Sequence, residues 1–308
     1  MNRRRFIQKG AVGSLLLGMG HLPLSACADQ QDYIQLTILH TNDVHSRIEP
    51  FPVDGGRFVY QGFGGAARRA ALIKQVRQES ENVLLLDAGD IFQGTPYFNF
   101  FDGELEFKLM NQMRYDAATI GNHDFDAGME ALAKQIDGSS FPLLNCNYGF
   151  GDTPLEKKTK PFTIIEKEGL KIGIFGLGIA LDGLVPPKLY GATQYFDPLQ
   201  HANATAAILR NEHKCHLIIA LSHLGYKYKQ KGMMCDVLLA QNSRNIDLIL
   251  GGHTHTFMEE PDVVRNLDGE EVLINQVGWA GILLGRLDYF FRKDFRKKRI
   301  VAKKIPIR

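Results

Sequence analysis

Hydrophobic runs that end abruptly in polar residues recur along the chain and predict strands that lead into functional loops. Segments with buried-strand or alternating character lie at residues 34–39, 82–86, 117–120, 217–222 and 246–250. Each is followed within a few positions by His, Asp or Asn. Because ligands of open α/β sheets bind beyond the carboxyl ends of the strands, the pattern predicts one site assembled from several strand ends.

Segments with helical periodicity alternate with these strands. The spacing of apolar residues predicts helices at 65–80, 104–113, 127–136 and 199–213. In the first helix we expect an apolar inner face and a basic outer face made of Arg68, Arg69, Lys74 and Arg77. Further strands are predicted at 141–145, 162–167, 171–177, 262–266, 272–276 and 284–291. Loops are expected at 46–63 and 176–187, the second bordering the site.

The densest polar stretch is Gly121-Asn122-His123-Asp124-Phe125-Asp126, between the strand that ends at Ile120 and the helix at 127–136. It places four side chains that bind metals or move protons within six residues. Asn122 and Asp126 are also common turn and helix-cap residues. His123 between them favours a functional loop.

Two acidic motifs follow earlier strands. Asp43 and His45 are two positions apart, and in extended backbone such side chains point the same way, so both can reach one divalent cation. Asp90 follows Gly89, which permits a sharp turn, and its two carboxylate oxygens can bridge two cations. We place Asp87, which lies within the apolar run, behind the site rather than in it.

Histidines end the two later strands. His223 follows the run at 217–222, while His253 and His255 follow the run at 246–250. A single histidine at a strand end is more often structural than a metal ligand. Its repetition at successive strand ends, with the Asp and Asn residues above, favours a metal site.

The motif order Asp-x-His, Gly-Asp, Gly-Asn-His-Asp, His and Gly-His-x-His resembles that of the calcineurin-like metallophosphoesterases. Leu-His-Thr-Asn-Asp-Val-His and Gly-Asp-Ile-Phe-Gln-Gly-Thr-Pro are similar to the catalytic domain of bacterial 5'-nucleotidases, and the resemblance covers residues 34–290. It implies a four-layer α/β/β/α fold of two mixed sheets flanked by helices. It also implies two divalent metal ions, such as Zn, Mn, Fe or Co.

Carried over by motif, the resemblance implies roles for nine residues. One metal would be bound by Asp43, His45, Asp90 and His255. The other would be bound by Asp90, Asn122, His223 and His253. His123 would be a catalytic residue that does not bind metal, Asp126 would orient it, and Asp124 receives no direct role. The implied activity is a 5'-nucleotidase-like phosphomonoesterase, with a small phosphoester such as a nucleotide as substrate and a metal-bound hydroxide as nucleophile.

Alternatives remain open at this point. The same metals would support a cyclic-nucleotide or nucleotide-sugar phosphodiesterase. The nucleotidases continue into a second, substrate-binding domain, which we expect to be missing here, so a separate chain could supply it. A metal-binding docking protein without turnover is also possible, but it would not need His123 and Asp126. We expect no nucleic-acid partner.

Charge is distributed unevenly over the 308 residues. With +2 overall, +4 in residues 1–26 and +8 in residues 292–308, the remaining body carries −10. We expect a single catalytic domain at 28–308 that ends in a basic hairpin, with Phe290 and Ile300 facing inward. The basic residues either discourage edge pairing or dock an acidic partner or anionic lipid.

Residues 1–27 are predicted to be an export signal. Arg3-Arg4-Arg5-Phe6-Ile7 resembles a twin-arginine signal, although an ordinary secretory signal is an alternative, and Leu24-Ser25-Ala26-Cys27 resembles a lipobox. We therefore expect a periplasmic or cell-envelope lipoprotein held on the membrane through Cys27. The other cysteines, Cys146, Cys215 and Cys235, are expected to be buried apolar residues or to form one optional bridge.

Overall fold

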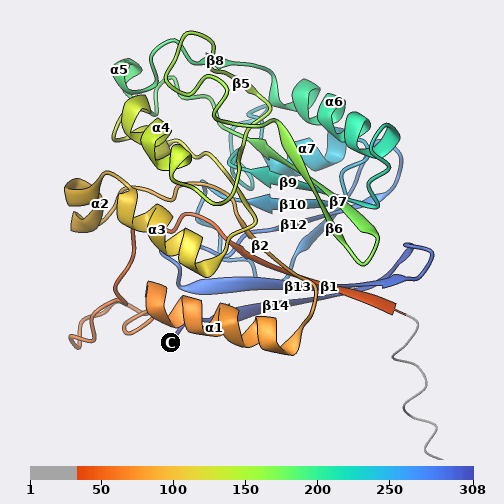
Figure 1. The fold of residues 1–308 in the computed structure, drawn as a ribbon, viewed down its shortest axis with the longest axis horizontal. Coiled ribbons are helices and arrows are strands. Elements are labelled where there is room, and N and C mark those ends of the chain that lie inside the picture. Colours follow the sequence, from red (N-terminus) through yellow and green to blue (C-terminus); the bar gives the residue numbers. More distant parts are fainter. Residues whose placement is uncertain (1–32) are drawn as a thin grey trace, which may run out of the picture. The chain divides into compact units, whose positions relative to one another are not determined.

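The computed structural model describes residues 33–308, and the predicted export signal and lipobox lie outside the described residues. The described chain holds two six-stranded mixed sheets and a small two-stranded one (Figure 1). The first sheet has the order β14-β13-β1-β2-β3-β4, with bounds Lys297–Pro306, Leu283–Arg292, Tyr33–Thr41, Val83–Asp87, Ala117–Thr119 and Leu143–Leu144. Strands β1 to β4 are parallel to one another, and β13 and β14 are antiparallel to their neighbours.

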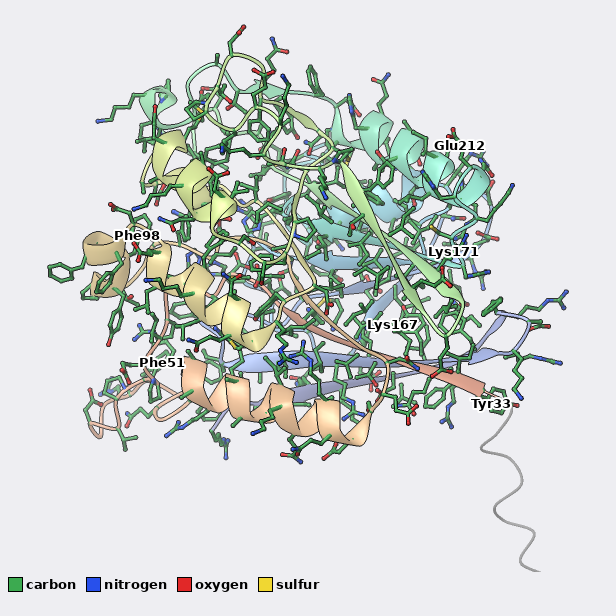
Figure 2. The ribbon with its side chains drawn as sticks, in the orientation of Figure 1. Tyr33, Phe51, Phe98, Lys167, Lys171 and Glu212 are labelled. Carbon is green, nitrogen blue, oxygen red and sulfur yellow. The ribbon has the colours of Figure 1, made fainter. Side chains whose placement is uncertain are left out.

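The second sheet also has a parallel centre, but it is antiparallel at both edges. Its order is β11-β12-β10-β9-β7-β6, with bounds Asp262–Arg265, Glu271–Asn275, Leu248–Gly251, Leu217–Ser222, Leu170–Leu177 and Phe162–Lys167. Lys167 and Lys171 flank the tight turn between β6 and β7 (Figure 2). The two-stranded sheet pairs β5 (Tyr148–Gly149) with β8 (Gln194–Tyr195).

Helices cover the outer faces of both large sheets. Their bounds are α1 Ala66–Glu79, α2 Pro96–Phe101, α3 Glu104–Met113, α4 Met129–Asp137, α5 Pro187–Tyr190, α6 Pro198–Asn211 and α7 Asp236–Asn242. Helices α1, α3 and α4 lie against the first sheet, and α6 and α7 lie against the second (Figure 1).

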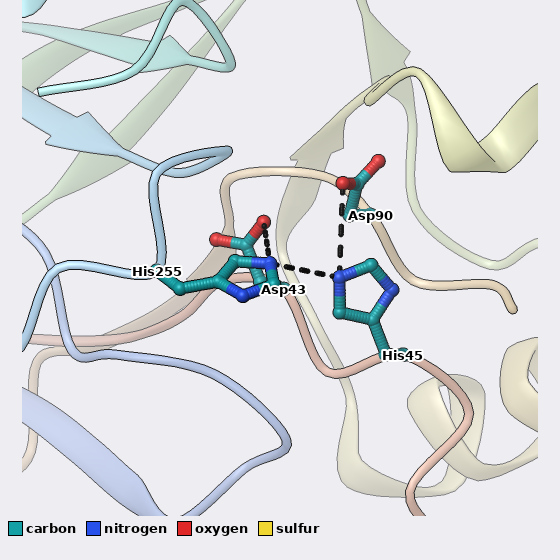
Figure 3. A group of neighbouring side chains, drawn as sticks. All are labelled: Asp43, His45, Asp90 and His255. Carbon is teal, nitrogen blue, oxygen red and sulfur yellow. Dashed lines mark hydrogen bonds and ion pairs between the residues drawn. The ribbon is translucent and has the colours of Figure 1, made fainter. Parts of the chain in front are cut away.

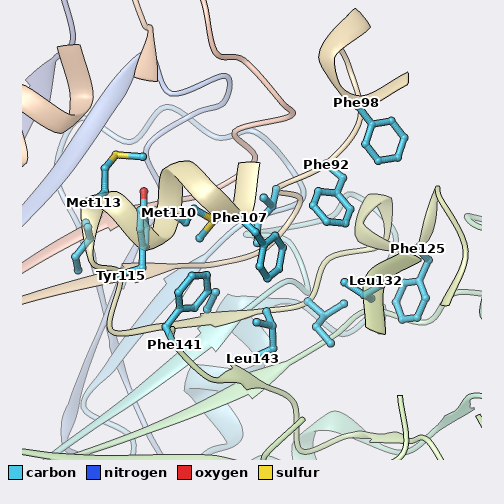
Figure 4. Packing of buried hydrophobic residues seen from close by; sticks show 14 of the residues in the cluster. Phe92, Phe98, Phe107, Met110, Met113, Tyr115, Phe125, Leu132, Phe141 and Leu143 are labelled. Atoms are coloured by element: carbon cyan, nitrogen blue, oxygen red, sulfur yellow. The ribbon is translucent and has the colours of Figure 1, made fainter. Parts of the chain in front are cut away.

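Three apolar clusters mark the three interfaces between layers. Ile73 of α1 and Met110 of α3 pack with Leu85 of the first sheet, in the cluster that also contains the rings of Figure 4. A second cluster joins the inner faces of the two sheets, and a third joins the second sheet to α6 and α7. Strands β2, β7 and β9 are apolar on both faces because each sheet is covered on both sides. The predicted four-layer α/β/β/α fold is confirmed.

Two predictions of side-chain direction are wrong. Arg69 is 4% exposed rather than on the outer face of α1. Phe290 pairs with Arg299 and is only half-buried, whereas its neighbours Tyr289 and Phe291 fill the space between the sheets. Side chains alternate between the two faces of a strand, so Phe290 points to the opposite face from Tyr289 and Phe291. The prediction of which β13 residues face inward was therefore shifted by one position.

Element boundaries also differ from those predicted. The strand expected at 141–145 covers only Leu143–Leu144, and the helix expected from residue 127 begins at Met129. Gly128 precedes that helix with a φ of 84°, a conformation that glycine adopts without strain. Helices α2, α5 and α7 and strands β5 and β8 were not predicted, because segments of two to seven residues carry too little periodicity.

Cysteines and candidate membrane segments add little to the architecture. Cys146, Cys215 and Cys235 are all free thiols, and the last two are buried. Burial raises the pKa of Cys146 to about 12. Within residues 33–308, none of the helices combines the length and apolar character that crossing a bilayer requires.

Candidate metal centre

The predicted site residues gather where the two sheets meet, at the carboxyl ends of their parallel strands. Asp43 and His45 follow β1, Asp90 follows β2, and Asn122 follows β3 in the first sheet. In the second sheet His223 follows β9, and His253 and His255 follow β10. Asp43 joins the halves, because its carboxylate oxygens accept the His253 backbone N–H at 2.9 and 3.0 Å.

The first cluster consists of Asp43, His45, Asp90 and His255, drawn in Figure 3. Each offers one ligand atom, and these atoms all lie within 4.8 Å of one another. His45 Nε2 is 3.0 Å from His255 Nε2 and 3.8 Å from Asp90 Oδ2. His255 Nε2 is also 3.4 Å from Asp43 Oδ1. This is the set that the resemblance implied for one metal.

The second cluster consists of Asp90, His223 and His253, with Asn122 beside it. His223 Nε2 is 3.0 Å from Asp90 Oδ2, and His253 Nδ1 is 2.8 Å from Asn122 Oδ1. Asp90 therefore belongs to both clusters. The structure brings together all seven residues predicted as metal ligands.

The protonation of the histidines fits a cation between these groups. His223 Nδ1 is 2.7 Å from the Ala88 carbonyl, and His45 Nδ1 is 3.1 Å from the Phe92 carbonyl. A carbonyl only accepts, so each Nδ1 donates, and in the neutral ring each Nε2 presents a lone pair toward the cluster. His223 Nε2 is buried and makes no hydrogen bond of ordinary geometry. Nitrogen lone pairs and carboxylate oxygens that face one another repel. A cation bound between them would remove this repulsion.

The pKa shifts of two of these histidines agree with that description. Burial lowers the pKa of His45, and burial together with His223 lowers the pKa of His253 to about 4, so both rings are neutral and able to bind metal. Burial alone would lower the pKa of His223 as well. The carboxylates of Asp90 and Asp43 outweigh it and raise that pKa to about 10, so without a cation this ring holds a proton that a bound metal ion would displace.

His123 lies beside the two clusters but belongs to neither. Its Nδ1 is 2.8 Å from Asp126 Oδ2, and its backbone N–H donates to Asp90 Oδ1 at 2.8 Å. The hydrogen bond to Asp126 raises the pKa of His123, with a further contribution from Asp90. The imidazole is 37% exposed, so it can reach a bound substrate.

Left-handed backbone brings the site residues together. Asp43, His45, Asp90, His253 and His255 have φ values between 50° and 70°. The expectation that Asp43 and His45 converge through extended backbone is therefore wrong, although both do join the first cluster. Non-glycine residues adopt this conformation rarely, and such strain gathers at functional sites.

Two supporting residues received no role from the sequence. Asp124 accepts four backbone N–H groups, those of Asp90, Ile91, Phe92 and Gly121, at 2.7–3.1 Å. It thereby joins the loop after β2 to the loop after β3. Asn42 donates to Asp43 Oδ2 at 2.7 Å and holds residues 277–278 with its other contacts. Both residues lie within the motifs that carry the predicted ligands, and this position was the one sequence feature that could have indicated a supporting role.

Asp87 supports the site from behind, as expected. Its carboxylate accepts the Thr41 hydroxyl at 2.5 Å and the Gly89 backbone N–H at 2.9 Å. Gly89 has a φ of 88°, and a Cβ there would lie 2.7 Å from the Gly121 backbone nitrogen and 2.9 Å from His223 Nδ1. The turn before Asp90 therefore requires glycine.

Comparison with known proteins identifies the family. Residues 36–257 match the family model described as calcineurin-like phosphoesterase, which is more than half of the chain. The chain belongs to the calcineurin-like phosphoesterase family. A snake venom 5'-nucleotidase from Crotalus adamanteus is 35% identical over 83% of this chain and 45% of its own length. A 5'-nucleotidase from Vibrio cholerae is 32% identical over 93% of this chain and 54% of its own.

A solved relative shares the fold of this phosphoesterase. The 5'-nucleotidase precursor from Thermus thermophilus superposes with a TM-score of 0.79 at 30% identity, covering 89% of this chain and 55% of that one. The chain spans about half the length of these relatives. The family match at residues 36–257 contains every residue of both clusters, together with His123 and Asp126.

Proposed function

We propose that this phosphoesterase hydrolyses phosphate monoesters with two divalent cations, one at each cluster, and that nucleoside 5'-monophosphates are its substrates. The observation that carries the proposal is the position of Asp90, whose carboxylate is common to both clusters. A carboxylate shared in this way is typical of two-metal hydrolases. Cations such as Zn, Mn, Fe or Co suit the mixed imidazole, carboxylate and amide ligands.

Bound at these clusters, the cations would supply a hydroxide nucleophile at neutral pH and polarise the phosphoryl oxygens. The chain's residues would do the rest. Asp90 would hold its position through the His123 backbone N–H and through the hydrogen bond from its own backbone N–H to Asp124. His123, oriented and kept protonated by Asp126, would donate from its free Nε2 to the phosphoryl group or the leaving oxygen.

Nucleotide substrates are supported by the names of the relatives, several of which are 5'-nucleotidases. A phosphodiesterase activity on cyclic nucleotides or nucleotide sugars would use the same residues. The two activities differ in whether the scissile phosphate carries one ester or two. A diester and a monoester with the same leaving group therefore separate them.

A panel of phosphoesters tests the proposal. The purified chain, loaded with Zn²⁺ or Mn²⁺, is incubated with AMP, p-nitrophenyl phosphate and bis(p-nitrophenyl) phosphate, and phosphate and nitrophenol are measured. We expect phosphate from AMP, loss of activity on chelation, and little hydrolysis of the diester. Equal rates for AMP and p-nitrophenyl phosphate would indicate that base selectivity needs a partner chain with a nucleotidase-type second domain. No hydrolysis of any ester by the metal-loaded protein would refute the function.

We also propose that the protein is exported by the twin-arginine route and is then held at the cell envelope through a lipidated Cys27. The motifs in residues 1–27 support this, and a venom enzyme among the relatives agrees with export. Labelled fatty acid should enter the wild type and not Cys27→Ser. Lys in place of Arg3 and Arg4 should block export, and continued export would favour the ordinary secretory route.

A further inference from the structure

A small cavity lies beside the loop that carries His45. It is bounded by Val44 and residues 46–48, by Arg69 of α1, by Asp87 at the end of β2 and by Glu106 of α3. The space open to the centre of a water molecule is about 20 Å³. Arg69 is 4% exposed and Glu106 is 5% exposed, so both charged side chains are shut away from bulk solvent.

Polar atoms without partners are concentrated in the wall of this cavity. Twelve buried side-chain nitrogen and oxygen atoms of the described residues lack a hydrogen bond. Six of them belong to residues that line this one cavity: Ser46 Oγ, Arg47 Nε, Arg69 Nε and Nη1, and Glu106 Oε1 and Oε2. The Ser46 hydroxyl is near enough to Glu106 to offset part of the rise that burial causes in its pKa, but the two form no hydrogen bond of ordinary geometry. Native proteins rarely leave so many buried groups unsatisfied in one place.

The charges around the cavity decide what can occupy it. Arg47 and Arg69 would repel a cation, and Asp87 and Glu106 would repel an anion. The wall offers both donors and acceptors, so the occupant must both accept and donate. Water does this, needs about 10–15 Å³ of such space, and makes about three hydrogen bonds when buried. The cavity therefore has room for one or two water molecules.

We propose that this cavity is a buried water site, and that Arg69 and Glu106 act through the water as positioning residues for the loop that carries His45. The second part rests on the proposed metal role of the first cluster. Ser46 connects the two sites: it lines the cavity, its backbone N–H donates to the Ile91 carbonyl at 2.9 Å, and its carbonyl accepts the Thr95 hydroxyl at 2.7 Å. The His45 N–H donates to the Asp90 carbonyl at 3.1 Å. Water beneath Ser46 would thus support the two loops that hold His45 and Asp90.

A crystal structure of the full chain, at a resolution that shows ordered water, tests the first part. We expect water within hydrogen-bond distance of both Glu106 and Arg69. A dry cavity, an ion in it, or side chains collapsed into it would overturn the proposal. This result does not depend on whether the protein binds metal or turns over substrate.

The positioning role is tested by metal affinity. Glu106→Leu removes two of the acceptors, Glu106→Gln keeps the shape with one acceptor and a donor, and Glu104→Leu is the matched control on the exposed face of the same helix. Zn²⁺ affinity is measured by competition with a chelator, and unfolding of the metal-free proteins is measured alongside. We expect about tenfold weaker binding for Glu106→Leu, a smaller loss for Glu106→Gln and none for Glu104→Leu.

Other outcomes have separate meanings. Reduced stability of metal-free Glu106→Leu with unchanged Zn²⁺ affinity would show a structural role only and overturn the positioning part. If Glu106→Leu does not fold, Glu106→Gln and Arg69→Lys carry the test, since Arg69→Lys keeps the charge but loses the fixed geometry of the guanidinium. Both should weaken Zn²⁺ binding, and unchanged affinity in both would overturn the positioning role. A wild type that binds no Zn²⁺ would refute the proposed function and leave the water site standing.

Discussion

The two clusters differ in how far they are open to solvent. In the second cluster the side chain of His223 is 0% exposed and that of Asp90 is 2% exposed. In the first cluster the His255 side chain is 40% exposed, and its ring lies parallel to that of Trp279 with centroids 5.8 Å apart. Each cluster therefore has one half-buried histidine, His253 in the second and His255 in the first, but only the second contains a histidine with no exposed surface, His223.

This difference indicates that the two clusters would bind and exchange their cations differently. A fully buried histidine beside a buried carboxylate is costly to leave without a partner, so the second cluster should bind its cation tightly and exchange it slowly. The first cluster should exchange more readily. His123 lies on the same accessible side, with a ring centroid 5.3 Å from that of His45.

The largest effect is expected where the clusters share a residue. Asp90→Asn should lower occupancy of both metals and reduce kcat by about 10³-fold or more, since metal activation supplies several kcal/mol of transition-state stabilisation. Metal content by mass spectrometry and phosphate release are the measurements. A variant that keeps one full equivalent of metal would show that Asp90 is not shared.

His123→Ala should separate catalysis from metal binding. We expect phosphate release to fall by about 10²–10³-fold, because a positioned donor to developing charge is lost. Metal content should stay as in the wild type, since His123 belongs to neither cluster. Loss of a metal in this variant would reassign His123 as a ligand.

Paired substitutions test the contrast between the two clusters. His223→Ala removes a fully buried partner of Asp90 and should lower the unfolding free energy by about 3–5 kcal/mol, as when one member of a buried ion pair is removed. His255→Ala, at the exposed edge, should lower metal occupancy with little change in stability. Equal losses of stability in thermal or denaturant unfolding would contradict the contrast.

The site residues that could be predicted from the sequence are those that lie in short motifs. All seven predicted ligands converge, because polar residues after parallel strands gather at the carboxyl ends of their sheet, and the two sheets meet at those ends. Asp43 and His45 do converge, as predicted, but through left-handed rather than extended backbone. A spacing of two residues does not reveal a left-handed conformation. That their roles are those of ligands stays a prediction.

The part that was missed depends on contacts between distant segments. Arg69 and Glu106 are ordinary surface types on amphipathic helices, and only the packing of α1 against α3 buries them. Asp124 accepts hydrogen bonds from four backbone N–H groups, and such contacts cannot be recognised from the types of the residues involved. The four-layer fold was implied by the family resemblance, whereas elements of two to seven residues were not predicted.

The smallest effect is expected for the residue that orients His123. Asp126→Asn keeps the size of the side chain but removes the charge that raises the pKa of His123. A loss of about tenfold in kcat is expected, toward the low end for perturbing an acid catalyst, with metal content unchanged. A rate equal to that of the wild type would remove Asp126 from the catalytic group.

The central claim, that one carboxylate serves two metal ions, is tested most directly by anomalous diffraction from crystals of the metal-loaded protein. We expect two anomalous peaks about 3.5–4 Å apart, the separation typical of two-metal sites, one on each side of the Asp90 carboxylate. One peak should lie among His45, Asp43 and His255 and the other between His223 and His253. A single peak at saturating metal, or two peaks that do not share Asp90, would contradict the dinuclear centre.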